Sequence, residues 1–158
     1  MTGFKKDIKI LLEKDNFQNY LDELHSYPPQ KIINSLFKYL YSTDKKIKEN
    51  AITGMGEVVS KLAVTEPESA RNVIRRLMLS VTEESGSIGW GAPAAMGEIM
   101  ARSKLLAEEF HNILISYALV DEDNYLDFNG LQKDVISGLK RLASAHPHLT
   151  DKVKHLLT

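Results

Sequence analysis

The residues best suited to binding a partner lie in two neighbouring stretches of the sequence. Arg71 and Arg75 are four positions apart, so on a helix their guanidinium groups share one face and can bind carboxylates or phosphates. Gly89, Trp90 and Gly91 precede a predicted helix, where backbone N–H groups can bind an anion and the indole can anchor a partner. We predict that the two stretches form one partner-binding surface at the rim of a helical groove.

Both stretches also allow a purely structural interpretation. The two arginines can belong to a solvated face that pairs with Glu66 or Glu68. The glycine-rich block 86–93 can simply turn the chain while Trp90 covers the core. This block is not a dinucleotide-binding fingerprint, because Ala94 replaces the third glycine and no strand precedes it.

Residue types that are typical of enzymes and metal sites do not combine into a site. The five histidines show no metal-binding spacing such as His-Glu-x-x-His. The stretch 121–130 is acidic, but no register of a calcium loop places glycine at position six and glutamate at position twelve. Glu57 and Glu98 could act as an acid–base pair. Their equivalent places in two sequence units favour a structural duty instead, such as capping or bonding to the termini of the next helix. We therefore predict no catalytic residue, metal ligand or cofactor.

The composition is that of one ordinary soluble domain. The 158 residues are 43% hydrophobic, which suffices for a single core. Twenty Lys and Arg against 21 Asp and Glu give a net charge of -1, which argues against a dedicated nucleic-acid binder. The lack of cysteine excludes disulfides and cysteine nucleophiles. No stretch approaches the ~20 apolar residues of a membrane span, so we expect a cytoplasmic protein.

Apolar residues recur at helical spacing almost everywhere, as in Ile8, Leu11 and Leu12, and nowhere alternate as in a strand. The first 17 residues read as one helix. Turn-forming residues separate the predicted helices at 27–29, 42–44, 65–67, 84–87, 121–130 and 146–147. We predict an all-α fold built from helical hairpins.

The sequence contains an internal repeat. Residues 55–59, Met-Gly-Glu-Val-Val, return 41 positions later as Met-Gly-Glu-Ile-Met at 96–100. Residues 61–63, Lys-Leu-Ala, return 80 positions later as Arg-Leu-Ala at 141–143. Residues 28–41 match the second helix of an earlier unit. Within a single domain, 1–158, we place the repeats at 4–41, 43–82, 87–120 and 128–158.

A hairpin of about 40 residues cannot bury its apolar face alone, so such units must stack on one another. Gly56 and Gly97 lie within predicted helices, where glycine costs ~1 kcal/mol relative to alanine. We therefore predict that a neighbouring helix approaches closely at both glycines. The predicted core comprises Ile33, Leu36, Met55, Val58, Leu62, Val73, Leu77, Met96, Ile99, Leu114, Leu142 and Val153.

The repeat period, the paired helices, the prolines that start second helices and the segment Ala94-Ala-Met-Gly-Glu-Ile99 together resemble the HEAT-repeat superfamily. The resemblance covers about residues 28–158 and is greatest to the short HEAT-like repeats of bacterial proteins and phycobilisome lyase subunits. The block 86–93 looks like a signature of small bacterial HEAT-like proteins. The resemblance implies a right-handed α–α superhelix whose second helices line a concave face.

These inferences favour a non-enzymatic interaction module or scaffold, a monomer or weak homodimer, that binds a protein partner through its concave groove. One alternative is a nucleic-acid-handling protein related to HEAT-like DNA glycosylases, using Trp90, Tyr117 and Arg75. The balanced charge argues against it, because phosphate contacts dominate such binding. Another alternative is a lyase-like role, which the repeat resemblance alone supports.

Overall fold

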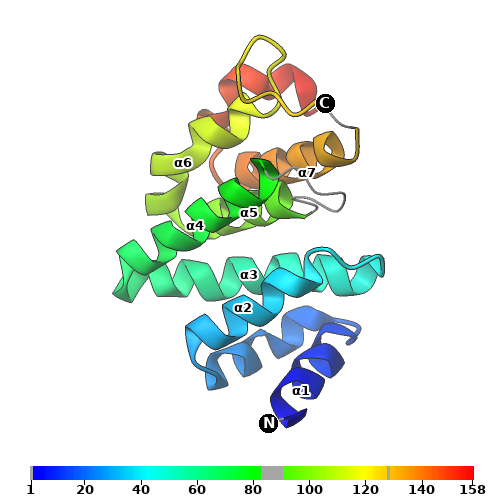
Figure 1. The fold of residues 1–158 in the computed structure, drawn as a ribbon. Helices are drawn as coiled ribbons and strands as arrows, with labels where there is room; N and C mark the ends of the chain where they lie inside the picture. The colour runs from blue at the N-terminus through cyan, green and yellow to red at the C-terminus, as the bar shows by residue number, and fades with distance from the viewer. Residues whose placement is uncertain (1, 83–90, 128) are drawn as a thin grey trace.

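The computed structural model describes residues 2–82, 91–127 and 129–158. Every regular element within these ranges is a helix, and none is a strand, which confirms the predicted all-α class (Figure 1). Two of the elements, η1 and η2, are 3-10 helices. In chain order, the helices are α1 (Thr2–Leu12), η1 (Phe17–Ser26), α2 (Pro29–Tyr39), α3 (Lys45–Thr65), α4 (Pro67–Thr82), α5 (Ala92–Arg102), α6 (Lys104–Ser116), α7 (Asn129–Ala145) and η2 (Pro147–Leu156).

The N-terminal segment is not the continuous helix that the sequence predicted. Helix α1 ends at Leu12, and Asn16 then adopts a left-handed conformation with φ 56°, which an α-helix cannot accommodate. The side chain of Asn50, on α3, donates hydrogen bonds to the carbonyls of Leu12 and Lys14 at 2.9 and 3.1 Å. This contact satisfies carbonyls that the end of α1 leaves unpaired.

Local sequence signals start most of the helices where we expected them. Asp44 caps α3, because its Oδ1 accepts a hydrogen bond from the Ile47 N–H at 3.1 Å. Ser103 caps α6 in the same way, through the Leu106 N–H at 3.3 Å, at a helix boundary that we had not predicted. Proline is the first residue of α2, α4 and η2, where the missing N–H costs nothing.

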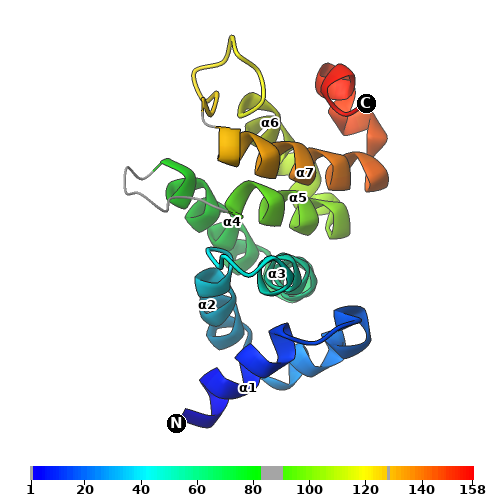
Figure 2. The same ribbon diagram turned by 90° about the vertical axis from the view of Figure 1, so that its right-hand side faces the viewer.

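The helices form antiparallel pairs that follow one another along the molecule (Figures 1 and 2). Helices α3, α5 and α7 succeed each other in one layer, and α2 and α4 lie on one side of it. Helix α5 packs more extensively against α3 and α7 than against α6, its partner in the hairpin. As a result, residues 92–100 of α5 are all buried.

The twelve core residues predicted from the sequence are all buried, and none is more than 5% exposed. They belong to a single apolar cluster that extends from α1 to η2. The confirmation follows from helical periodicity, since one face of each amphipathic helix is buried whatever the neighbouring helices are.

Close helix crossings occur at glycines, as predicted for Gly56 and Gly97. A Cβ atom on Gly56 would lie 2.5 Å from Glu98 Cγ, and one on Gly97 would collide with the backbone of Gly138 on α7. We did not predict a role for Gly138, which lies 41 residues after Gly97; a Cβ there would collide with the Pro93 carbonyl. Helices α5 and α7 therefore meet backbone to backbone at a pair of glycines.

Candidate functional site

An ion-pair network connects four helical elements, η1, α3, α5 and α7. In spatial order its members are His25, Glu57, Arg102, Glu98 and Arg141. Acidic and basic groups alternate along the whole network. Each carboxylate therefore lies between two nitrogen donors, one on either side.

Glu98 is the most deeply buried member, with a side chain that is 7% exposed. Arg141 donates to both of its oxygens, from Nε to Oε1 at 2.7 Å and from Nη2 to Oε2 at 2.9 Å. Arg102 donates from Nε to Oε2 at 2.6 Å. A nearly dry carboxylate with two guanidinium partners is a strongly stabilised anion.

Arg102 connects this pair to α3. Its Nη1 donates to Glu57 Oε1 at 3.2 Å, and Glu57 Oε2 lies 2.7 Å from His25 Nε2. Gly56 provides the space for this connection, because its missing side chain leaves room for the Glu98 stem and for Arg102. The glycine and glutamate that recur in the repeat therefore act together across one helix contact.

Hydrogen bonds control the ionisation of Glu98. Burial raises the pKa of this carboxyl, but the hydrogen bonds and charges of Arg141 and Arg102 outweigh burial, so its pKa lies below the usual 4.5. The hydrogen bond to Glu98 raises the pKa of Arg141 in turn. Glu98 is thus an anion at neutral pH, and not a protonated acid.

The arrangement confirms that Glu57 and Glu98 have a structural duty, and it corrects the form of that duty. Both carboxylates bind guanidinium side chains of the following unit, and neither bonds to the unpaired backbone groups of a helix terminus as we had suggested. The His25–Glu57 pair joins η1 to α3, so it contributes to the stacking of these two elements.

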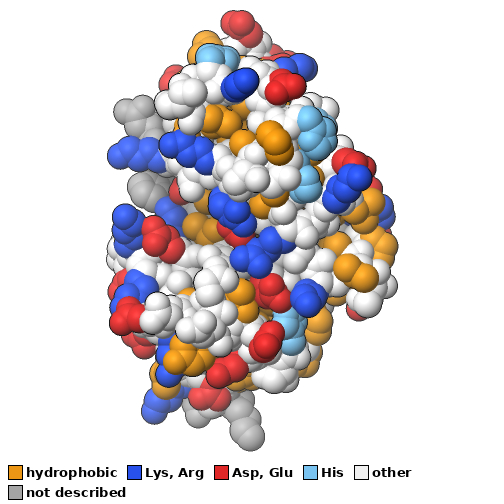
Figure 3. Space-filling view, turned by 180° about the vertical axis from the view of Figure 1, so that it is seen from behind, with side chains coloured by type: hydrophobic (Ala, Val, Ile, Leu, Met, Phe, Trp, Pro, Cys, Tyr) orange, Lys and Arg blue, Asp and Glu red, His pale blue; other side chains and the backbone are white. Residues whose placement is uncertain are grey.

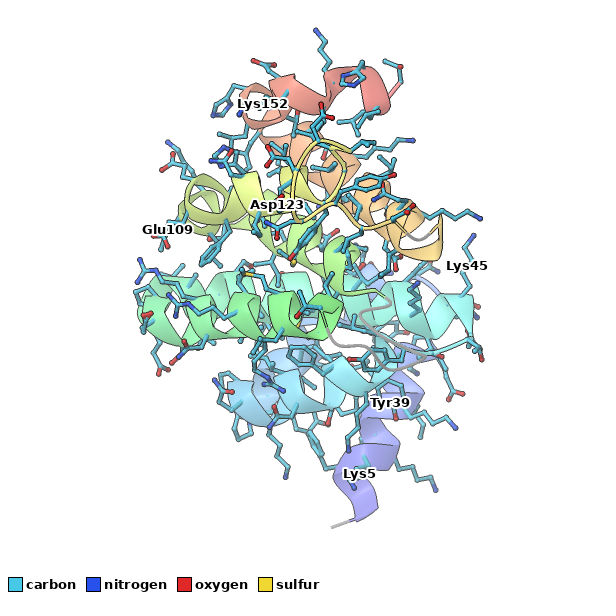
Figure 4. The ribbon with its side chains drawn as sticks, turned by 45° about the horizontal axis from the view of Figure 1, so that its top comes forward. Lys5, Tyr39, Lys45, Glu109, Asp123 and Lys152 are labelled. Carbon is cyan, nitrogen blue, oxygen red and sulfur yellow. The ribbon has the colours of Figure 1, made fainter. Side chains whose placement is uncertain are left out.

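The arginines of the predicted binding surface are engaged with carboxylates of the same chain. Arg71 donates two hydrogen bonds to Glu109 on α6, at 2.7 and 2.8 Å, and these lower the pKa of Glu109. Figure 4 shows Glu109 on α6, beside the first turns of α4. Arg75 contacts Glu68 at 3.1 Å and Asn72 at 2.8 Å. The pairing of Arg75 with Glu68 was the alternative that we considered from the sequence.

The glycine-rich part of that surface is described only from Gly91 onwards. Gly89 and Trp90 lie outside the described residues, so the combined surface with Arg71 stays a prediction. Gly91 itself is buried, has φ +82° and precedes α5. Its N–H donates to Asp134 Oδ2 at 2.7 Å, so Gly91 has a structural role that the sequence did not reveal.

Helix α7 presents an open face beside the ion-pair network. Its described residues line an open hollow of about 960 Å³, and those residues are Gln132, Lys133, Ile136, Ser137, Lys140, Arg141 and Ser144. Three of them are cationic, and none of them is acidic. Figure 3 shows the face of the molecule that points away from the viewer in Figure 1, and Lys and Arg side chains form a diagonal band across that face. Spacing along α7 places these cations on one side of the helix, but it does not show which side the stack leaves open, and from the sequence we singled out α4 instead.

The structure also bears on metal binding, on Tyr117 and on membrane spans. Across the described ranges, no three His, Asp or Glu side chains are grouped as a metal site would require. Tyr117, which the nucleic-acid alternative used for stacking, is only 3% exposed, and burial raises its pKa to about 12. Its ring is therefore not available at a surface. None of the described helices is both long enough and apolar enough to cross a bilayer.

Comparisons with known proteins supply one similarity. No family model and no solved structure matches the chain. An uncharacterized protein of the archaeon Archaeoglobus fulgidus is 30% identical over 135 residues, which cover 83% of this chain and 64% of that protein. The chain therefore spans less than two thirds of the length of this relative. The similarity provides no activity to transfer.

Proposed function

We propose that this protein is a HEAT-like stack of helical hairpins that serves as a non-enzymatic protein-interaction module. The repeat resemblance, the successive packing of α3, α5 and α7 and the ion-pair network that links successive units all support this interpretation. Repeat proteins of this type use extended helical surfaces to hold partners. A right-handed superhelix and a cytoplasmic location belong to the same proposal.

The observation that carries the proposal is the open hollow along α7. It extends from Gln132 to Ser144, about 18 Å along a helix at 1.5 Å per residue. The side of α7 that lines this hollow is held in place, because Arg141 is hydrogen-bonded to buried Glu98 and α7 meets α5 at Gly138. A rigid, elongated and solvent-open surface suits a segment of another protein better than an enclosed small molecule.

Affinity capture tests the proposed function. The tagged protein is incubated with an extract of its source cells treated with nuclease, and the captured proteins are quantified by mass spectrometry against a tag-only control. Each enriched protein is then purified, and its binding is measured by calorimetry. The proposal predicts at least one partner that binds with a defined stoichiometry. Capture that occurs from a parallel untreated extract and disappears after nuclease treatment would support the nucleic-acid alternative instead.

A further inference from the structure

The outer face of α7 concentrates positive charge on a chain whose net charge is -1. Lys133, Lys140 and Arg141 line the same hollow, at helical positions i, i+7 and i+8. Within the described residues, neither Lys133 nor Lys140 forms an ion pair or hydrogen bond. Both lysines are exposed, whereas Arg71 and Arg75 on α4 already bind carboxylates.

We propose that this α7 face, residues 132–144, docks an acidic segment of a partner protein, one with at least two carboxylates and an aliphatic side chain. The inference rests on the proposed function and specifies the chemistry of the partner. Charge complementarity selects the acidic character, since the described lining contains three cations and no carboxylate.

Hydrogen bonds within the protein hold the Arg141 side chain in position for such a ligand. Glu98 holds its guanidinium through Nε and Nη2, and Nη1 donates to Ser144 Oγ at 3.0 Å. An arginine has five N–H donors, so these three contacts leave two for a partner. The Arg141 side chain is still 45% exposed. Its position is therefore fixed before binding, which reduces the entropy lost when a carboxylate binds.

Ile136 provides an apolar contact between the charged groups. It is half-buried on the same wall, one helical turn after Gln132 and one before Lys140. A nucleic acid that binds these cations through its phosphates would leave Ile136 without an apolar partner. An acidic peptide with a leucine or isoleucine can satisfy both the cations and Ile136, which is why we favour a protein segment over nucleic acid.

Fluorescence polarisation with defined probes tests the proposal. The first probe is a fluorescein-labelled 15-residue peptide that has glutamate at every third or fourth position and one central leucine. The matched probe replaces each glutamate with glutamine, and a labelled single-stranded 20-nucleotide DNA represents a polyanion. The proteins are the wild type, Lys133→Gln/Lys140→Gln, and Lys5→Gln/Lys9→Gln. The last variant removes two exposed lysines from α1 and so makes the same change in net charge.

The proposal predicts that the glutamate peptide binds the wild type and that the glutamine peptide does not. Loss of Lys133 and Lys140 should weaken binding about tenfold, because each exposed charge pair contributes modestly. Loss of Lys5 and Lys9 should leave the affinity within about twofold. Ile136→Ala should weaken binding of the glutamate peptide and leave binding of the DNA unchanged. Circular dichroism and urea unfolding confirm that each variant is folded.

Three results would overturn the docking site. They are an absence of peptide binding, equal losses in the two lysine variants, or DNA binding that is tighter than peptide binding and equally sensitive to Lys133 and Lys140. The site and the proposed function can fail separately. A captured partner that binds the wild type and Lys133→Gln/Lys140→Gln equally would contradict the site alone, whereas failure to capture any partner would contradict the proposed function.

Discussion

Arg141 and Glu98 are 43 residues apart in the sequence, yet two parallel hydrogen bonds join their side chains between α7 and α5. The same two helices touch at Gly97 and Gly138, where backbone meets backbone. A polar clamp and a close steric fit thus act on one helix pair. Together they fix the position of the α7 face that we propose as a docking site.

Removal of Arg102 should destabilise the protein more than removal of Arg141. Arg102→Met leaves Glu57 and Glu98 each without one partner, and we expect a loss of about 2–4 kcal/mol in the free energy of unfolding. Arg141→Met should cost about 1–2 kcal/mol, because Arg102 still neutralises Glu98. Urea denaturation measures both. Arg75→Met, which breaks an exposed ion pair, is the control. If Arg75→Met costs as much stability as Arg102→Met, the buried network has no special role in stability.

Acid should abolish the stabilisation that Glu98 provides. Its pKa is lowered in the folded state, so the contribution is complete above the ordinary value of 4.5 and is lost as the pH falls through the folded pKa. The stability difference between the wild type and Glu98→Gln should therefore be large at pH 7 and shrink as the pH falls below 4.5. Urea denaturation across this pH range provides the measurement. A difference that stays constant with pH would show that Glu98 acts through packing and not through charge.

Gly97→Ala should be strongly destabilising even though alanine favours helices. The new methyl group would collide with the Gly138 backbone, which cannot move away as a flexible side chain can, and we expect a cost of about 3 kcal/mol. Gly3→Ala is the matched control, because nothing lies within 4 Å of its added Cβ. Thermal unfolding distinguishes the two. If both substitutions leave the melting temperature unchanged, the close crossing of α5 and α7 does not exist.

Gly91→Ala should destabilise the start of α5 through backbone conformation. A positive φ costs a non-glycine residue about 1–2 kcal/mol, and the Cβ would also lie 2.7 Å from the Leu40 carbonyl oxygen. Gly54→Ala is the comparison, since its Cβ would meet only side-chain atoms, the nearest at 3.3 Å. Calorimetric melting should show a larger loss for Gly91→Ala, and a larger loss for Gly54→Ala would contradict this explanation.

Periodicity sufficed to predict the helical class and the buried faces, because each helix carries its own apolar stripe. Repetition identified Gly56 and Gly97 as contact positions and Glu57 and Glu98 as structural residues. The interruption at Asn16 escaped prediction, because its left-handed conformation leaves no periodic signal. Gly138 escaped for a different reason. The last unit was aligned through residues 141–143, which lie 80 positions after 61–63. This places the last unit 39 residues after the one before it, whereas Gly97 and Gly138 are 41 residues apart.

The candidate site depended on pairings that a sequence does not contain. Spacing placed Arg71 and Arg75 on one face, but it could not show that Glu109, on the next hairpin, binds Arg71. The open face of α7 depends on which side of α7 the stack leaves uncovered. That side is fixed by the Gly97–Gly138 crossing and by Asp134, whose carboxylate accepts from the Gly91 N–H.

Hydrogen–deuterium exchange tests the central claim most directly, that this chain binds a protein partner through its α7 face. Exchange is measured by mass spectrometry for the protein alone and in complex with its purified captured partner. We predict slower exchange in peptides that cover residues 132–144 and no change in peptides from α4. Protection confined to residues 67–82 of α4, or no protection anywhere in the complex, would contradict the claim.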